Sequence, residues 1–374
     1  MTSGKLPTTT PRPGLLLLLA LIGAAVVVLF AATSNASAQD ATRVDLPGVA
    51  IPLAKCTGID ACTGIVDLSQ VGEGSCNGEA SCYHISPYTG TIGAGSCNGY
   101  AACYHNDPTI GAVGDNACNG YEACWRAGGG IGDNSCYGNG ACSAAAGSIG
   151  KGSCFGSYAC ANVAGSISAS SCNGSNACSV AAGPIGASSC NGYEVCFGAG
   201  GAISDDSCAG DSACTAAAGP IGAGSCIGDV ACSRAAGTIG ASSCIGERAC
   251  RLTGGQISNN ACSSFQACAS VTGSVGASSC NGFQACTSVT GSVGAGSCNS
   301  FQACASAAGS NGNNSCNSFQ ACASAAGSIG NNSCTTTGSA CQATGTFPIG
   351  DCQRNDVAPA ACLISRAYLP LIQQ

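Results

Sequence analysis

The chain has few of the side chains that fill a globular core or build an active site. Of its 374 residues only 5% are aromatic and 8% charged, with one Trp, one Met and two His. The apolar fraction consists mainly of Ala and Cys, which does not indicate a conventional core. Nothing resembles Ser-His-Asp or paired catalytic carboxylates, so we expect neither an enzyme nor a cofactor. The net charge of -7 and the scattered Lys and Arg argue against nucleic-acid binding.

Cysteine and glycine are abundant instead, with 34 Cys and 57 Gly. So much cysteine is typical of disulfide scaffolds made in an oxidising compartment, although such scaffolds are usually short. Zinc and iron–sulfur sites favour Cys-x2-Cys spacing, which never occurs here, so no metal is expected. We therefore predict a disulfide-bonded protein that lies outside the cell or at its surface, with the periplasm as a further option.

The N-terminus has the pattern of an export signal. Lys5 and Arg12 precede an apolar run over 15–32, and Ala36-Ser37-Ala38 is a small-residue cleavage site. This predicts a signal peptide over 1–38. The apolar run also reaches the lower limit for a membrane span, so an uncleaved N-terminal anchor is the alternative and the only membrane contact that we expect.

An internal repeat dominates the rest of the chain. From Cys118 to Cys334 a Cys recurs every eighteen residues, and a second Cys follows six residues after each up to Cys316, while Cys341 follows Cys334 after seven. With the first Cys as column one, the full repeats from Cys118 on always have Gly in column twelve. Column six is Ala, column ten Ala or Val, column fourteen Ile or Val, and column eighteen Ser, with one exception each: Val195, Thr253, Asn311 and Ala261. Three further Cys-x5-Cys pairs precede the regular array: Cys56/Cys62, Cys76/Cys82 and Cys97/Cys103.

This pattern predicts an all-β, single-domain β-solenoid (β-helix) of about sixteen coils, each adding one rung of about 4.8 Å. Fixed columns of small or aliphatic residues are expected to point inward, and Gly at the corners to supply the positive φ of tight turns. The handedness is not determined by the sequence. The predicted parts are an N-terminal cap over 39–55, the repeats over 56–351 and a C-terminal cap over 352–374.

The cysteines compensate for a thin core. One aliphatic side chain per coil contributes about 2 kcal/mol, and a disulfide closing so short a loop contributes roughly as much. We predict one disulfide inside each coil, because every coil then satisfies itself. Bridges between neighbouring coils and metal thiolates are the alternatives. The predicted disulfides include Cys118–Cys124, Cys136–Cys142, Cys154–Cys160, Cys298–Cys304 and Cys316–Cys322.

The stretch Ser297-Cys-Asn-Ser-Phe-Gln-Ala-Cys-Ala-Ser-Ala-Ala308 resembles the repeat of the hyperactive beetle antifreeze proteins, Thr-Cys-Thr-x-Ser-x-x-Cys-x-x-Ala-x. Cys298, Cys304 and Ala307 fall on the two Cys and the Ala of that family. The resemblance implies a similar architecture, a β-solenoid with a disulfide inside each coil. The family's ice-binding Thr ladder is missing, since Ser297 and Asn299 stand in its place, and the coil has eighteen residues rather than twelve.

Column four carries the most informative outward residues. A column that accepts Asp and Glu in other coils must reach solvent or lie on a corner, so its Phe residues form a stacked ladder beside a row of Gln. The ladder has two interpretations, structural support of the rungs and a surface for binding. Its residues are Phe265, Phe283, Phe301 and Phe319, followed by Gln266, Gln284, Gln302 and Gln320.

Two other features are candidate sites. His84 and His105 follow Cys-Tyr pairs in consecutive longer coils, where a weak metal site near Asp107 competes with plain exposed loops. The hexad Ile131–Cys136 is similar to that of left-handed β-helix acyltransferases, which leaves a hexapeptide-type or carbohydrate-active enzyme as a remote alternative.

We therefore expect an exported, non-enzymatic structural or adhesive rod. Its partner is unknown; glycan, cell-wall polymer, ice and self-association are the options. Ice binding is the main alternative, since stacked rungs make a regular surface on which Ser of column eighteen forms the only ordered hydroxyl row.

Overall fold

The computed structural model describes residues 55–65, 67–83, 90–104 and 111–335. By compactness the chain divides into a unit Met1–Pro52 and a unit Leu53–Gln374, and the description concerns the second unit. The predicted signal peptide, almost all of the N-terminal cap, the C-terminal cap and the pair Cys334/Cys341 are outside the described residues or only partly within them. Within these residues, no helix has the length and apolar character that crossing a membrane would require.

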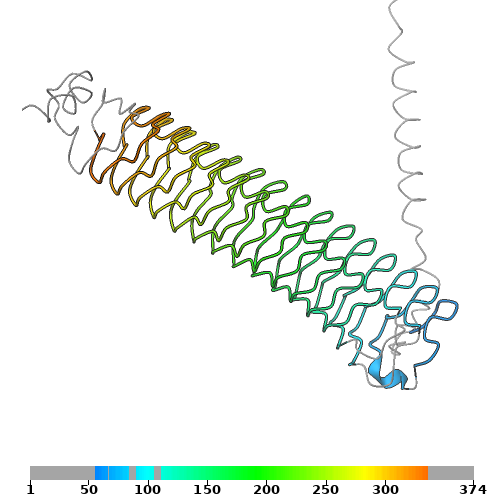
Figure 1. The fold of residues 1–374 in the computed structure, drawn as a ribbon. Coiled ribbons are helices and arrows are strands. Elements are labelled where there is room, and N and C mark those ends of the chain that lie inside the picture. Colours follow the sequence, from blue (N-terminus) through cyan, green and yellow to red (C-terminus); the bar gives the residue numbers. More distant parts are fainter. Residues whose placement is uncertain (1–54, 66, 84–89, 105–110, 336–374) are drawn as a thin grey trace, which may run out of the picture. The chain divides into compact units, whose positions relative to one another are not determined.

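The described residues wind into successive coils that lie one on the next, as Figure 1 shows. We call this array the coil stack. Its named element is one short 3-10 helix, η1, at Leu68–Gln70. Asp67 caps η1, because its side chain accepts a hydrogen bond from the backbone N–H of Ser69 at 2.9 Å. Most other positions are turns, bends and single-residue bridges.

Parallel bridges join each coil to the next. They run through column fourteen from Val71 to Ile329, and a shorter series runs through column two. At Ile131 the backbone N–H donates to the carbonyl of Ala112 at 2.9 Å, and the N–H of Gly132 donates to Ile149 in the following coil at 2.8 Å. In the described part of the chain these bridges are isolated and build no extended strand, so the all-β solenoid class stays a prediction.

The interior of the stack is narrow and is filled by small side chains and sulfur. From Cys118 on, columns one and seven carry fully buried Cys, and columns six and ten carry Ala, Val or, once, Thr253, with almost no exposed surface. Column fourteen supplies one aliphatic side chain per coil, at most 5% exposed. The thin core that the repeat predicts is therefore present. Asn311 is the exception in column fourteen, where a polar side chain replaces the aliphatic one.

The prediction that corner glycines supply positive φ is confirmed at column three, where Gly138 has φ of 132° and Gly156 has φ of 130°. It fails at column twelve, where none of the glycines has positive φ. Each is needed for a close approach: a Cβ on Gly129 would lie 2.3 Å from the carbonyl oxygen of Gly147 in the next coil. The other positions with positive φ are columns one, five, nine and seventeen. They hold mostly residues other than Gly, including the first Cys of each coil, such as Cys118 with φ of 57°.

The serines of column eighteen lie inside the stack, at most 1% exposed. Ser207 is typical: its hydroxyl donates to the carbonyl of Gly222 at 2.8 Å and accepts from the N–H of Ser225. This agrees with an inward column. The expectation that the same serines form the exposed hydroxyl row of an ice-binding surface is wrong, because buried hydroxyls that are hydrogen-bonded to the backbone do not face solvent.

Candidate interaction surface

The structure joins the two cysteines of each Cys-x5-Cys pair within one coil, from Cys56–Cys62 to Cys316–Cys322. Among the described cysteines none is free. Sulfur atoms of neighbouring coils also come close, with those of Cys118, Cys124 and Cys136 all within 4.8 Å of one another. Because these cysteines are disulfide-bonded, they are not available as thiolate ligands. The Cα atoms of the predicted pairs Cys118–Cys124, Cys136–Cys142, Cys154–Cys160, Cys298–Cys304 and Cys316–Cys322 are 5.5–5.6 Å apart.

Four phenylalanines of column four stack in consecutive coils, and we call them the Phe ladder: Phe265, Phe283, Phe301 and Phe319. The ring centroids of successive members are 5.1, 5.3 and 5.3 Å apart, and the ring planes are inclined by 16°, 3° and 7°. The repeat itself creates this geometry, because one residue per coil in the same column is held at the spacing of the rungs. Phe283, Phe301 and Phe319 are 41%, 39% and 61% exposed.

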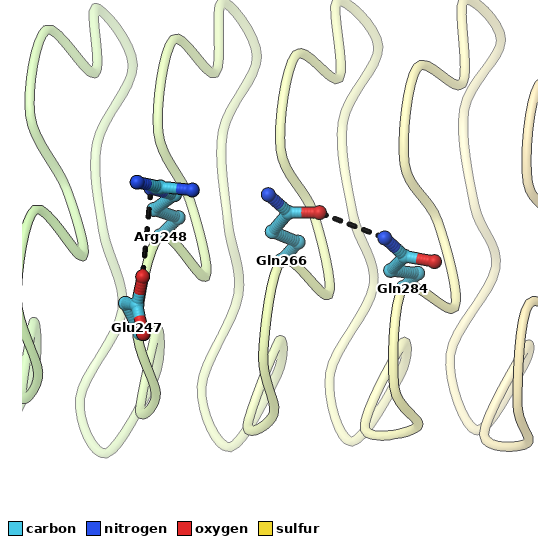
Figure 2. Close-up of polar contacts among 4 residues, drawn as sticks. All are labelled: Glu247, Arg248, Gln266 and Gln284. Carbon is cyan, nitrogen blue, oxygen red and sulfur yellow. Dashed lines mark hydrogen bonds and ion pairs between the residues drawn. The ribbon is translucent and has the colours of Figure 1, made fainter. Parts of the chain in front are cut away.

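The glutamines of column five form a second row, the Gln ladder: Gln266, Gln284, Gln302 and Gln320. The side-chain Nε2 of Gln284 donates to Oε1 of Gln266 at 2.8 Å (Figure 2), and the same bond repeats at the next two steps at 2.9 and 2.8 Å. Each of these residues has a left-handed backbone. Every inner amide thus keeps one N–H and one acceptor position for a partner.

Other aromatic residues that share a column also stack between successive coils. Tyr100 stacks on Tyr121 in column four at 5.1 Å, and Tyr83 stacks on Tyr104 in column eight at 5.2 Å. Tyr137 and Phe155, in column two, stack at 5.1 Å, a contact that sequence reasoning missed. Its signal is simple, since two aromatics stand eighteen residues apart in the same column.

Exposed hydroxyls occur in columns eleven and thirteen, which sequence reasoning also missed. The hydroxyl of Ser274 donates to that of Ser292 at 3.2 Å, and Thr272 donates to the carbonyl of Thr290 at 3.2 Å. In column eleven the hydroxyls are confined to Thr272 and Thr290. Column thirteen carries an exposed Ser or Thr in several further coils, and it is unbroken through the four coils of the Phe ladder: Ser274, Ser292, Ser310 and Ser328.

The ionisable side chains described do not converge on a catalytic arrangement. His84 is outside the described residues, as are His105 and Asp107. The pKa of Tyr193 is raised because its hydroxyl is hydrogen-bonded to Glu194 and because that carboxylate is negatively charged. Tyr121 has its pKa raised in the same way, with the charge of Glu122 as the largest cause. A tyrosine whose pKa is raised in this way stays protonated near neutral pH.

Charge is divided sharply along the sequence. No Asp, Glu, Lys, Arg or His occurs between Leu252 and Gly350. We call the described part of this stretch, residues 252–335, the uncharged segment. The coil that precedes it carries Glu247 and Arg248, whose side chains pair at 3.6 Å beside the first residue of the Gln ladder (Figure 2). The Phe and Gln ladders therefore begin where the charges end.

Comparison with known proteins identifies one family. The family described as Domain of unknown function (DUF7640) matches residues 34–157, 108–196, 193–301 and 250–357. No curated protein and no solved structure matches the chain. The overlapping matches cover most of the sequence, as expected where the same unit recurs. The chain is thus a cysteine-rich, disulfide-bonded repeat protein, and it belongs to the family described as Domain of unknown function (DUF7640).

Proposed function

We propose that this protein is an exported, non-enzymatic structural or adhesive protein, built as a β-solenoid, whose Phe and Gln ladders contact a partner at the cell surface or in the extracellular space. The observation that carries the proposal is the Phe ladder, three of whose rings are 39–61% exposed on a disulfide-bonded support. Exposed apolar rows of this length are typical of surfaces that bind a partner.

The support around the ladder favours a binding role over a purely structural one. Each Phe lies on a coil that is closed by its own buried disulfide and hydrogen-bonded to both neighbours. Coils with Asp211 and Asp229 in column four stack in the same manner, so aromatic stacking is not required for the rungs to form. The disulfides themselves are typical of an oxidising, extracellular environment.

In this proposal the resemblance to beetle antifreeze repeats is one of architecture and not of activity. The intracoil disulfides and the buried column-ten alanines support a common building plan. We do not propose ice binding, because the serines of column eighteen, on which that alternative depends, are buried.

An adhesion assay tests the proposal. The oxidised protein is applied to intact cells of the organism that produces it, to polymers of that organism's cell envelope and to uncharged polysaccharides. The amount bound is compared with the amount of the double variant Phe283→Asp/Phe301→Asp that binds. Asp is compatible with column four, since Asp211 and Asp229 occupy it in consecutive coils. The matched control is Tyr100→Asp/Tyr121→Asp, the same change in the same column of the charged coils. We expect binding to fall at least about tenfold for the first variant only. Equal binding by all three proteins would overturn the proposal.

A further inference from the structure

The Phe ladder presents ring edges to its surroundings. Successive rings lie nearly parallel, 5.1–5.3 Å apart, so the faces of Phe283 and Phe301 are covered by neighbouring rings. Sugar binding by aromatic residues uses the open face of a ring, on which the sugar lies flat. The ladder offers no such face at its two central positions. A partner of the ladder must instead pack against a row of ring edges.

The surroundings of the ladder are polar but carry no charge. The Gln ladder lies beside it, and Thr and Ser hydroxyls are exposed in the same coils. Removing ionised groups from water would cost several kcal/mol per ion, and this face has none to remove. An uncharged partner with its own apolar edges and amides therefore complements the uncharged segment.

The spacing between successive rings of the ladder favours an uncharged partner whose own side chains repeat at the same spacing. Rows of stacked aromatic and Gln side chains pack most closely against an identical row, because side chains of equal spacing stay in register along the whole row. A second copy of this chain has the same spacing by construction. Each Phe of one copy can then meet the ring edge of a Phe of the other copy.

We propose that the chain forms a two-fold antiparallel dimer, in which the Phe and Gln ladders of one copy pack against the same ladders of a second copy. This names the partner of the surface assigned under the proposed function and rests on it. Two-fold symmetry is the common solution for a self-complementary patch. In this arrangement Phe265 of one copy faces Phe319 of the other, and the centre lies between Phe283 and Phe301.

Charge fixes the antiparallel orientation. Acidic residues outnumber basic ones in the chain, and every described ionisable side chain lies between Lys55 and Arg251. A parallel dimer would align the acidic coils of the two copies along their whole length. Antiparallel packing of the uncharged segments sends the acidic coils of the two copies in opposite directions, which removes this repulsion.

Sedimentation equilibrium tests whether the protein dimerises. The oxidised protein is used in the form that the producing cell exports. We expect a monomer–dimer equilibrium that Phe283→Asp/Phe301→Asp weakens by at least about a hundredfold, whereas Tyr100→Asp/Tyr121→Asp leaves it within about threefold. Because the contact is uncharged, the dissociation constant should change by less than about threefold between low and high salt. A protein that stays monomeric at all concentrations, or a dimer that only the Tyr variant disrupts, would overturn the proposal.

The orientation is tested by a photoreactive phenylalanine analogue in place of Phe265. Antiparallel packing predicts cross-links to the coil of Phe319, while parallel packing predicts cross-links to the coil of Phe265 itself. Chymotryptic peptides separate the two results, and cross-links of the second kind would reject the antiparallel dimer. If the protein is monomeric but its adhesion still depends on Phe283 and Phe301, a polymer rather than a second copy occupies the ladder. The dimer is then wrong and the adhesive function stands.

Discussion

Gly201 lies so close to Gly219 of the next coil that a Cβ on Gly201 would be 2.3 Å from the Gly219 carbonyl oxygen. Real Cβ atoms do not approach a carbonyl oxygen so closely. The coils can therefore stack at this corner only if column twelve lacks a side chain, and the same restriction recurs along the stack.

This contact predicts that Gly201→Ala lowers the free energy of unfolding by about 2 to 3 kcal/mol, because backbone must move to admit the methyl group. The neighbouring Gly200 is the matched control. A Cβ there would meet its nearest atom at 3.5 Å, and Ala stands in the same column at Ala218. Gly200→Ala should change the stability by less than about 1 kcal/mol. Guanidinium unfolding under oxidising conditions measures both, and equal stability of the two variants would contradict the close approach.

The sequence repeat predicted which residues lie next to one another better than it predicted the backbone conformation, and column twelve shows why. Spacing alone indicated the inward position of Ile329 and the stacking of Phe283 on Phe301, because residues in the same column of successive coils must lie side by side. The partner of Cys298 needed a further argument, that a disulfide inside each coil leaves no coil unsatisfied. It did not distinguish a glycine needed for positive φ from one needed for a close approach, since either requirement excludes a side chain. For Gly201 only the backbone conformation separates the two.

The serine row was ambiguous for a related reason. A small polar residue in every coil suits an exposed hydroxyl surface as well as an interior where each hydroxyl bonds a carbonyl. The second is found at Ser207 and its neighbours. Hydrogen-bond partners supplied by backbone of the next coil are not visible in a residue pattern, and neither are the left-handed backbones at Cys118 and Gln284.

Asn311 is expected to weaken the stack. Its side chain is 4% exposed, its Nδ2 has no hydrogen-bond partner in the described part of the chain, and it stands between Val293 and Ile329 in column fourteen. Asn311→Ile should raise the free energy of unfolding by about 1 to 3 kcal/mol, the cost of burying an unsatisfied polar group. Ile329→Asn, the reverse change one coil away, should lower it. Unchanged stability in Asn311→Ile would mean that a buried water satisfies the amide.

Ala261 interrupts the buried serine row, so no hydroxyl in this coil can accept from the N–H of Ser279. In the preceding coil, the hydroxyl of Ser243 accepts from the N–H of Ala261 at 3.2 Å and donates to Ser258. Ala261→Ser should stabilise the stack by about 0.5 to 1.5 kcal/mol and slow hydrogen exchange of the Ser279 amide, because the row becomes continuous. Ser243→Ala should have the opposite effect. Faster exchange at Ser279 in Ala261→Ser would show that the column is too narrow for the hydroxyl.

The burial of the serine row also predicts that the oxidised protein causes no thermal hysteresis. Ice binding needs a long, ordered and exposed row, whereas the exposed hydroxyls of column thirteen are interrupted at Pro184, Ala202, Pro220 and Gln256. They form an unbroken row of more than two coils only from Ser274 to Ser328. Nanolitre osmometry with ice-shaping observation measures this directly. Hysteresis that disappears in Thr272→Ala/Ser274→Ala would instead assign ice binding to columns eleven and thirteen.

The left-handed backbone of the first cysteine predicts how a coil tolerates losing its disulfide. Cys208 has φ of 58° and is bonded to Cys214. Removing the bridge with Cys208→Ala/Cys214→Ala should cost roughly 2 kcal/mol from the lost loop constraint. Ala, like the Cys that it replaces, is disfavoured in the left-handed region by about 1 to 2 kcal/mol, whereas Gly is not. Cys208→Gly/Cys214→Ala should therefore unfold at a higher guanidinium concentration, although it has lost the same sulfur atoms. If the Ala variant were the more stable of the two, the coil would have abandoned this backbone, and the disulfide would be what holds column one in its left-handed conformation.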